Sequence, residues 1–133
     1  MAGLTVLDAS VLIAYFGPGD VHTDAATALL EQADDLAAST ITFAEVLAGA
    51  TRLGRDQELL AALTDLGVAE VPIVDGAAAL AELRVATGLR MPDCCVLLAA
   101  DTLQASSVAT FDDRLAKAAE QKGYAAVGSS TSP

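Results

Sequence analysis

Four carboxylates stand at places in this sequence where a reactive site could be built. Asp8 directly follows the apolar run LTVL, and Asp112 directly follows VATF. Glu45 and Asp93 stand near the predicted starts of two apolar helices, in TITFAEVLAG and LRMPDCCVLLAA. In an open parallel α/β sheet, ligands bind outside the carboxyl ends of the strands. The sequence therefore predicts that these acids meet at one end of one sheet.

Carboxylates that meet in this way repel one another unless something positive lies among them. Clustered carboxylate oxygens are the ligands that a hard divalent cation requires, with water completing the coordination shell. The sequence thus predicts a Mg²⁺ or Mn²⁺ site formed by Asp8, Glu45, Asp93 and Asp112.

Helix capping is the simpler explanation for each acid taken alone. Asp8 or Ser10 could cap the helix that follows, which is worth about 1 kcal/mol. Thr42 and Glu45 match the T-x-x-E capping box. Asp93 and Asp112 suit the positive end of a helix dipole, at about 0.3–1 kcal/mol each. Capping does not explain the convergence, because Ser, Thr or Asn would cap without repulsion, so the joint pattern favours a metal site.

Short apolar runs alternate with helical patterns along the chain, with turn residues between them. Strands separated by helices imply right-handed crossovers and a parallel sheet covered on both faces. We expect a single α/β domain over residues 1–133, a three-layer sandwich with a five-stranded, mainly parallel central sheet, ending in a flexible tail at 128–133. The expected strands are 4–7, 36–38, 68–74, 108–111 and 124–127, and the expected helices are 10–16, 23–33, 41–53, 56–66, 76–87, 92–104 and 112–122.

Composition supports one folded domain and excludes several other classes of protein. The 133 residues are 53% hydrophobic with a mean hydropathy of +0.48, which is enough to bury a sizeable core. The apolar stretches fall far short of the roughly 18–20 residues of a membrane span, and no basic secretory leader begins the chain. The two cysteines are adjacent, so a disulfide framework is not expected. A reduced cytoplasmic location without membrane contact is the prediction.

The net charge of -11 is unevenly placed. Residues 1–51 carry seven acids and no Lys or Arg, which gives -7, and residues 52–133 carry eleven acids and seven bases, which gives -4. This balance argues against a domain that binds nucleic acid mainly through a basic face. It leaves open a site that binds a cation first and a phosphate through it.

Four segments of the chain resemble the PIN-domain ribonucleases, and most closely the VapC toxins of bacterial toxin–antitoxin pairs. The resemblance covers nearly the whole chain in the expected order, and the ordered set is more specific than any one motif. The segments are LTVLDASVLIAYF at 4–16, TITFAEVLAG at 40–49, LRMPDCCVLLAADTL at 89–103 and VATFDDRLAKAAEQKGY at 108–124.

The resemblance implies a Mg²⁺- or Mn²⁺-dependent endoribonuclease that leaves a 5′-phosphate and a 3′-hydroxyl. Asp8, Asp93 and Asp112 are the implied metal ligands, and Glu45 is either a further ligand or a base that orients the attacking water. The implied functional positions, carried over by their match to the family's motif, are Asp8, Ser10, Glu45, Asp93, Thr110 and Asp112.

Two further acids depart from the pattern of the family. Asp113 adds a carboxylate beside Asp112, and it either shares the role of Asp112 or is solvated. Asp101 lies in a helical stretch that is often apolar in relatives, and we do not assign it to the site.

The remaining polar residues of interest have ordinary structural explanations. The single histidine, His22, is expected at the surface or at a helix cap. Three arginines, Arg84, Arg90 and Arg114, could contact RNA phosphates, but exposed salt bridges are the simpler expectation. The adjacent cysteines, Cys94 and Cys95, are expected to be small buried side chains behind Asp93.

Two other functions are compatible with an acidic α/β domain. A receiver-like domain would use Asp75, after VPIV, as its phosphoacceptor, but it would also need an acidic pair after the first strand and a lysine after the fifth. A catalytically inactive PIN-like scaffold would bind a partner without cutting RNA, and it has no reason to tolerate four repelling acids. For the toxin, the resemblance implies a cognate VapB-type antitoxin, an RNA substrate and a homodimer.

Overall fold

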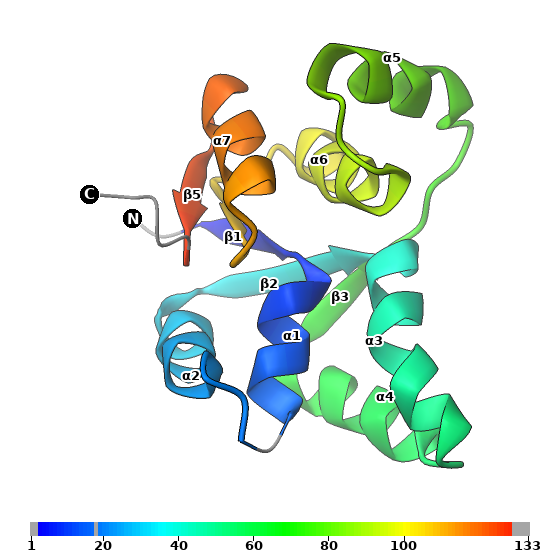
Figure 1. Cartoon of the computed structure of the whole chain (residues 1–133), viewed down its shortest axis with the longest axis vertical. Coiled ribbons are helices and arrows are strands. Elements are labelled where there is room, and N and C mark those ends of the chain that lie inside the picture. Colours follow the sequence, from blue (N-terminus) through cyan, green and yellow to red (C-terminus); the bar gives the residue numbers. More distant parts are fainter. Residues whose placement is uncertain (1–2, 18, 129–133) are drawn as a thin grey trace.

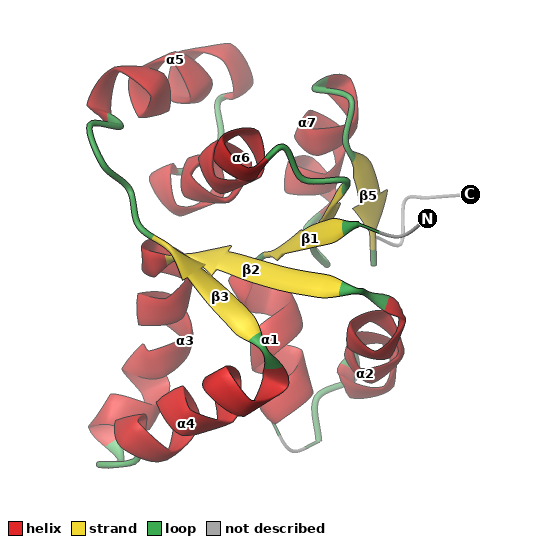
Figure 2. Ribbon diagram, turned by 180° about the vertical axis from the view of Figure 1, so that it is seen from behind, coloured by secondary structure: helices red, strands yellow, loops and turns green. Residues whose placement is uncertain are grey.

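The computed structural model describes residues 3–17 and 19–128, so the expected tail falls outside it beyond Gly128. A central sheet lies between two layers of helices, with α5, α6 and α7 on one face and α1 to α4 on the other (Figures 1 and 2). The elements are β1 (Leu4–Leu7), α1 (Ala9–Phe16), α2 (Thr23–Gln32), β2 (Asp35–Ser39), α3 (Thr40–Arg52), α4 (Asp56–Leu66), β3 (Val68–Val71), α5 (Ala77–Thr87), α6 (Met91–Leu103), β4 (Ser107–Ala109), α7 (Asp113–Gln121) and β5 (Ala125–Val127). This confirms the expected three-layer α/β sandwich.

All five strands are parallel, in the order β3-β2-β1-β4-β5. The chain first builds outward from β1 through β2 to β3, and then crosses to the other side of β1 to form β4 and β5. The order therefore reverses between β1 and β4. In open α/β sheets this reversal leaves a crevice outside the carboxyl ends of the two strands, where ligands bind.

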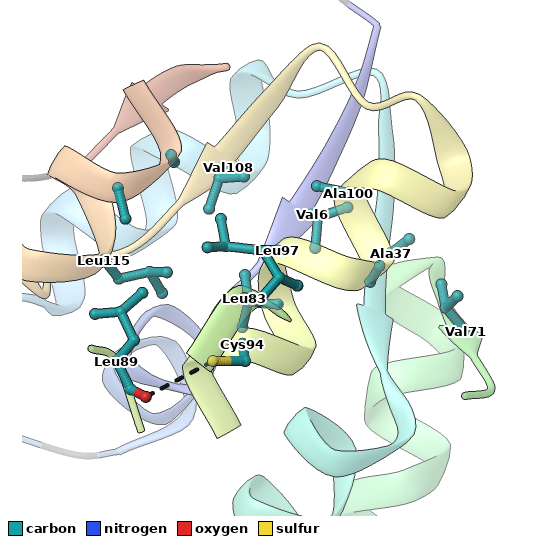
Figure 3. Close-up of a cluster of buried hydrophobic side chains, with 14 residues drawn as sticks. Val6, Ala37, Val71, Leu83, Leu89, Cys94, Leu97, Ala100, Val108 and Leu115 are labelled. Atoms are coloured by element: carbon teal, nitrogen blue, oxygen red, sulfur yellow. Dashed lines mark hydrogen bonds between the residues drawn. The ribbon is translucent and has the colours of Figure 1, made fainter. Parts of the chain in front are cut away.

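Side chains of the strands alternate between two apolar layers. Val6 and Val108 point to the layer under α6, where they pack with Leu97 and Leu115 (Figure 3). The neighbouring Leu7 packs into the opposite layer, with the side chains of α1 to α4. A parallel sheet buried on both faces needs apolar residues on both, which explains why the strand sequences are continuous apolar runs.

The helices are short. The longest in residues 3–17 and 19–128, α3 and α6, have 13 residues each, which is about 20 Å of helix. A membrane span needs about 20 apolar residues, and no helix in this part of the chain is long and apolar enough to cross a bilayer.

The third strand is shorter than the expected 68–74. It ends at Val71, because Pro72 has no N–H to donate and the chain leaves the sheet there. β3 is also an edge strand, so no neighbour on its far side extends it. Val74 is 74% exposed rather than part of a buried strand.

The capping box expected from Thr42 and Glu45 is wrong. Helix α3 begins at Thr40, and the Ser39 hydroxyl caps it by accepting the Thr42 N–H at 3.1 Å. Glu45 therefore lies in the second turn, where it has no orphan N–H to satisfy. Its position needs another explanation.

The receiver-like alternative is excluded by the topology. Receiver-like folds have the strand order 2-1-3-4-5, whereas the order here is β3-β2-β1-β4-β5. Asp75 is exposed on the connection beyond the edge strand β3, away from the reversal point between β1 and β4.

We expect Leu97→Ala to lower the free energy of unfolding by about 2–5 kcal/mol. Leu97 is fully buried in the centre of the layer beneath α6, so truncation leaves a cavity there. The control Val85→Ala, at a side chain that is 86% exposed, should change stability by less than about 0.5 kcal/mol. Urea denaturation measures both, and equal effects would contradict this assignment of the core.

Candidate functional site

Asp8 and Thr110 lie side by side at the point where the strand order reverses. The β1–β4 register pairs Leu7 with Ala109, so Asp8 and Thr110 are the next residues out of each strand. The Asp8 N–H donates to the Ala109 carbonyl at 2.9 Å, which extends the ladder by one bond. Both side chains are buried.

Two hydroxyl groups hold the Asp8 carboxylate. Ser10 Oγ donates to Asp8 Oδ2 at 2.8 Å, and Thr110 Oγ1 donates to the same oxygen at 2.7 Å. Asp8 occupies the N-cap position of α1, yet its side chain caps no N–H of that helix. Because both hydroxyls bind Oδ2, Oδ1 is the oxygen left for a ligand. The capping explanation for Asp8 therefore fails.

The same hydroxyls also fix the chain after β4. Ser10 Oγ accepts the Phe111 N–H at 3.1 Å, and Thr110 Oγ1 accepts the Asp112 N–H at 2.9 Å. Asp112 in turn caps α7, with Oδ1 accepting the N–H groups of Arg114 at 2.8 Å and Leu115 at 3.2 Å. Asp112 thus does serve as a cap, and its backbone is also tied to the group that holds Asp8.

Glu45 and Asp93 approach from the two helices that flank the end of β1. Burial raises the pKa of the Asp93 carboxyl above its ordinary value, and the charges of Asp8 and then Asp112 raise it further. Partial burial also raises the pKa of the Glu45 carboxyl, with added repulsion from Asp8 and Asp93. Asp93 is the third residue of α6 and is 7% exposed, whereas Glu45 is exposed on α3. The fold therefore brings all four predicted acids into one repulsive group.

Two arginines border this group. Arg90 Nε lies 4.0 Å from Asp93 Oδ2, and the Arg90 charge lowers the pKa of both Glu45 and Asp93. The charge of Arg114 lowers the pKa of Asp93. These opposing effects are weaker than burial and repulsion, because the pKa of both acids remains raised.

The donor set has the chemistry for a hard divalent cation. It offers only oxygen atoms on several carboxylates, which suits Mg²⁺ or Mn²⁺. The side chains do not form a closed shell as they stand: within residues 3–17 and 19–128, no three Asp, Glu, His or Cys side chains are gathered closely enough to hold an ion. The residue types and their repulsion fit a cation, and coordination would require the carboxylates to draw closer together.

Other residues singled out from the sequence lie outside this group. His22 is exposed and stacks on Phe111, with ring centroids 4.6 Å apart. Asp101 forms an ion pair with Lys122 at 3.2 Å, and Asp113 is the exposed first residue of α7.

The cysteines behind Asp93 are structural. Cys94 and Cys95 are almost completely buried, as predicted, and burial raises the pKa of both thiols. Raised thiol pKa values disfavour the reactive thiolate.

Two features near the site were not predicted from the sequence. Phe111 provides a ring for His22, and Lys117 lies one helical turn after Arg114 on α7. The spacing of Arg114 and Lys117 is an i, i+3 pattern on a predicted helix, which places both side chains on one face. That signal was present in the sequence. The pairing of His22 with Phe111, 89 residues later, had no local signal.

We expect Asp93→Asn to raise the melting temperature of the metal-free protein at pH 7 by an amount on the order of a few degrees. The raised pKa means that folding favours the protonated carboxyl; this stabilisation is present below the ordinary pKa and is lost as the pH rises through the raised value. At pH 7 the charged carboxylate therefore destabilises the fold, and the gain from Asn should shrink below about pH 4.

Thermal melts in EDTA across this pH range test the effect. The exposed Asp65 on α4 supplies the control, Asp65→Asn, which removes the same charge away from the site and should change little. A lower melting temperature for Asp93→Asn at pH 7 would contradict the inferred repulsion.

Several solved structures are similar to this one, and two of them are described as a toxin–antitoxin complex and as a toxin. A toxin–antitoxin complex from Klebsiella pneumoniae has a TM-score of 0.70 and 26% identity, over 81% of this chain and 86% of that chain. FitAcB from Neisseria gonorrhoeae has a TM-score of 0.70 and 22% identity, over 93% and 96%. VapC20 of Mycobacterium tuberculosis, a sarcin–ricin loop cleaving toxin, has a TM-score of 0.67 and 15% identity, over 90% and 95%. The last two show a shared fold alone.

Sequence comparison gives the family directly. No curated protein matches the chain significantly. The family profile of the PIN domain, however, matches residues 5–121 of the 133, a span that contains all six predicted site residues. The chain belongs to the PIN-domain family.

Proposed function

We propose that this protein is a Mg²⁺- or Mn²⁺-dependent endoribonuclease and the toxin of a toxin–antitoxin pair. The observation that carries the proposal is the Asp8 carboxylate, held at the strand reversal by Ser10 and Thr110 and repelled by two further acids. A site built in this way brings carboxylates close together and keeps one oxygen of Asp8 outside the two hydroxyl contacts. Membership of the PIN-domain family supports a nuclease.

Asp8, Asp93 and Asp112 are the proposed ligands of the cation. Asp8 is held by hydroxyls on one oxygen, and Asp112 uses Oδ1 to cap α7, so each keeps its second oxygen for the ion. When bound, a divalent cation lowers the pKa of a coordinated water and polarises a phosphate oxygen.

Glu45 is placed differently from the other three acids. It lies on α3, across the reversal point from α7, and it is the most exposed of the four. Its raised pKa favours holding a proton more than an ordinary glutamate does. Glu45 is therefore either an additional ligand or a base that orients the attacking water, and the variant Glu45→Gln separates the two by whether cation binding survives.

The proposals of an RNA substrate and of an antitoxin partner are based on the similar structures. VapC20 is a sarcin–ricin loop cleaving toxin, and the Klebsiella pneumoniae structure is a toxin–antitoxin complex. We propose that this chain also has a cognate VapB-type antitoxin and forms a homodimer. An acidic group without its cation can accept a basic side chain from a partner, which would relieve the same repulsion.

We expect Mn²⁺ to raise the melting temperature of the wild-type protein, because a ligand that binds only the folded state stabilises it by about 2.7 kcal/mol at 100 times its Kd. Asp8→Asn should lose most of this shift, and the surface control Asp65→Asn should keep it. Pulse expression followed by sequencing of RNA 5′-ends should show new 5′-phosphate ends with the wild type and with Asp65→Asn, but not with Asp8→Asn.

The outcomes separate the alternatives. A wild-type protein that neither responds to Mn²⁺ nor cleaves RNA would indicate the inactive scaffold. Cleavage of single-stranded DNA with no cleavage of RNA would keep the metal site and overturn the substrate.

A further inference from the structure

Positive charge in this chain is scarce, and most of it lies on one side of the acidic group. Two of the seven bases, Arg52 and Arg55, lie at the end of α3 and just before α4. The other five belong to α5, α6, α7 and the residues that flank these helices, and none lies in residues 1–51. Those five are Arg84, Arg90, Arg114, Lys117 and Lys122.

Three of the bases are used within the fold. Arg55 pairs with Glu58 at 2.8 Å, and Lys122 pairs with Asp101 at 3.2 Å. Arg84 Nη1 donates to the Leu89 carbonyl at 2.7 Å, which holds the α5–α6 connection. These contacts explain the positions of the three side chains without any ligand.

Arg52 lies in the last turn of α3, where a positive charge suits the helix dipole. Arg90, Arg114 and Lys117 are the three bases left without such an explanation. The Arg90 side chain is 75% exposed and only reaches 4.0 Å from Asp93. Arg114 is exposed and makes one long hydrogen bond, 3.4 Å from Nη2 to the Gly88 carbonyl. Lys117 is exposed, with no ion pair in the described part of the chain. An exposed pair such as Arg90–Asp93 contributes only about 0–1 kcal/mol, so stability does not explain these three side chains.

Arg114 and Lys117 line a hollow next to the acidic group. The hollow has a volume of about 320 Å³ and lies between the α5–α6 connection and α7, two segments on the same face of the sheet (Figure 1). Thr87 and Gln121 add neutral hydrogen-bonding groups, and none of the described residues that line it is acidic. The lining residues of α7 run from Arg114, two residues after Asp112, to Gln121, so the hollow follows α7. Leu89, which also lines it, precedes Arg90, whose Nε lies 4.0 Å from Asp93 Oδ2.

We propose that this hollow, together with the neighbouring Arg90, holds the phosphates of a single-stranded RNA on one side of the bond that is cut. The inference rests on the proposed function, and it names the side from which the substrate is held. A groove of positive charge that follows the backbone is how proteins bind single strands without reading their sequence. On the opposite side of the acidic group, residues 1–51 carry no base and would repel a polyanion, and the nearest bases in sequence, Arg52 and Arg55, follow at the far end of α3.

The double variant Arg114→Gln/Lys117→Gln tests the proposal against the matched double variant Arg52→Gln/Arg55→Gln, which removes the same charge at α3 and α4. We expect the first to raise the KM for a single-stranded RNA oligonucleotide by about tenfold or more near 0.15 M salt. The dependence of log KM on log salt should weaken by about 0.7 for each lost phosphate contact, or about 1.4 in total. The control should keep both the wild-type KM and the wild-type salt dependence.

Two further measurements isolate phosphate binding from damage to the site. The Mn²⁺-induced rise in melting temperature should persist in Arg114→Gln/Lys117→Gln, since neither side chain is a proposed ligand. The charge-conserving Lys117→Arg should retain the wild-type salt dependence, whereas Lys117→Gln should not.

The outcomes distinguish this inference from the function on which it rests. Suppose that the wild type cleaves RNA and that Arg114→Gln/Lys117→Gln has an unchanged KM and salt dependence. The hollow would then not be the RNA-binding site, and the proposed nuclease function would still stand. Equal losses in the Arg52→Gln/Arg55→Gln control would also exclude the hollow as that site, because net charge rather than position would then decide binding. A wild type that neither cleaves RNA nor responds to Mn²⁺ would overturn both.

Discussion

Like charges gather at the carboxyl ends of β1 and β4, and the rest of the fold has to hold them there. Asp8 cannot turn away, because the hydroxyls of Ser10 and Thr110 both donate to one of its oxygens. Asp93 cannot leave either, since it is buried at the start of a helix whose other side is packed into the core. Burial, together with repulsion between the acids, raises the pKa of Asp93 and Glu45. The two apolar layers must supply the stability that this arrangement removes.

The topology explains why the acidic group forms at this one place. A strand order that reverses between β1 and β4 leaves the ends of these two strands without a crossover above them. Asp8 and Thr110 become neighbours through the register of that strand pair, although 101 residues separate them along the chain. The same hydroxyl that binds Asp8 also receives the Asp112 N–H, so α7 begins at a fixed position relative to β1. One polar contact thus links the sheet, the α7 cap and the acidic group.

The layers, the parallel sheet and the acids at its edge could all be predicted, because apolar periodicity and the placement of acids after strands are local features. The prediction failed where a neighbour decides the structure. Pro72 ends β3 early, and the absence of a strand beyond that edge leaves nothing to extend it. The T-x-x-E pattern predicts Thr42 as the cap of α3, but Ser39 caps it instead. Ser39 and Thr42 both carry a hydroxyl that can cap a helix beginning in this segment. Which oxygen of Asp8 each hydroxyl would bind depends on strand register, which a single sequence does not encode locally.

The acidity of this molecule is compatible with the proposed RNA substrate, because the acidic and basic side chains are separated in space. The acidic group favours positive charge close to it. Under the proposed function a divalent cation supplies that charge at the centre, and Arg114 and Lys117 bind the RNA phosphates alongside. A basic side chain from an antitoxin would satisfy the same acids. The two solutions compete, since either one neutralises the charge that attracts the other. Under the proposed function, a partner would therefore inhibit the nuclease by occupying its negative site before the cation and the RNA do.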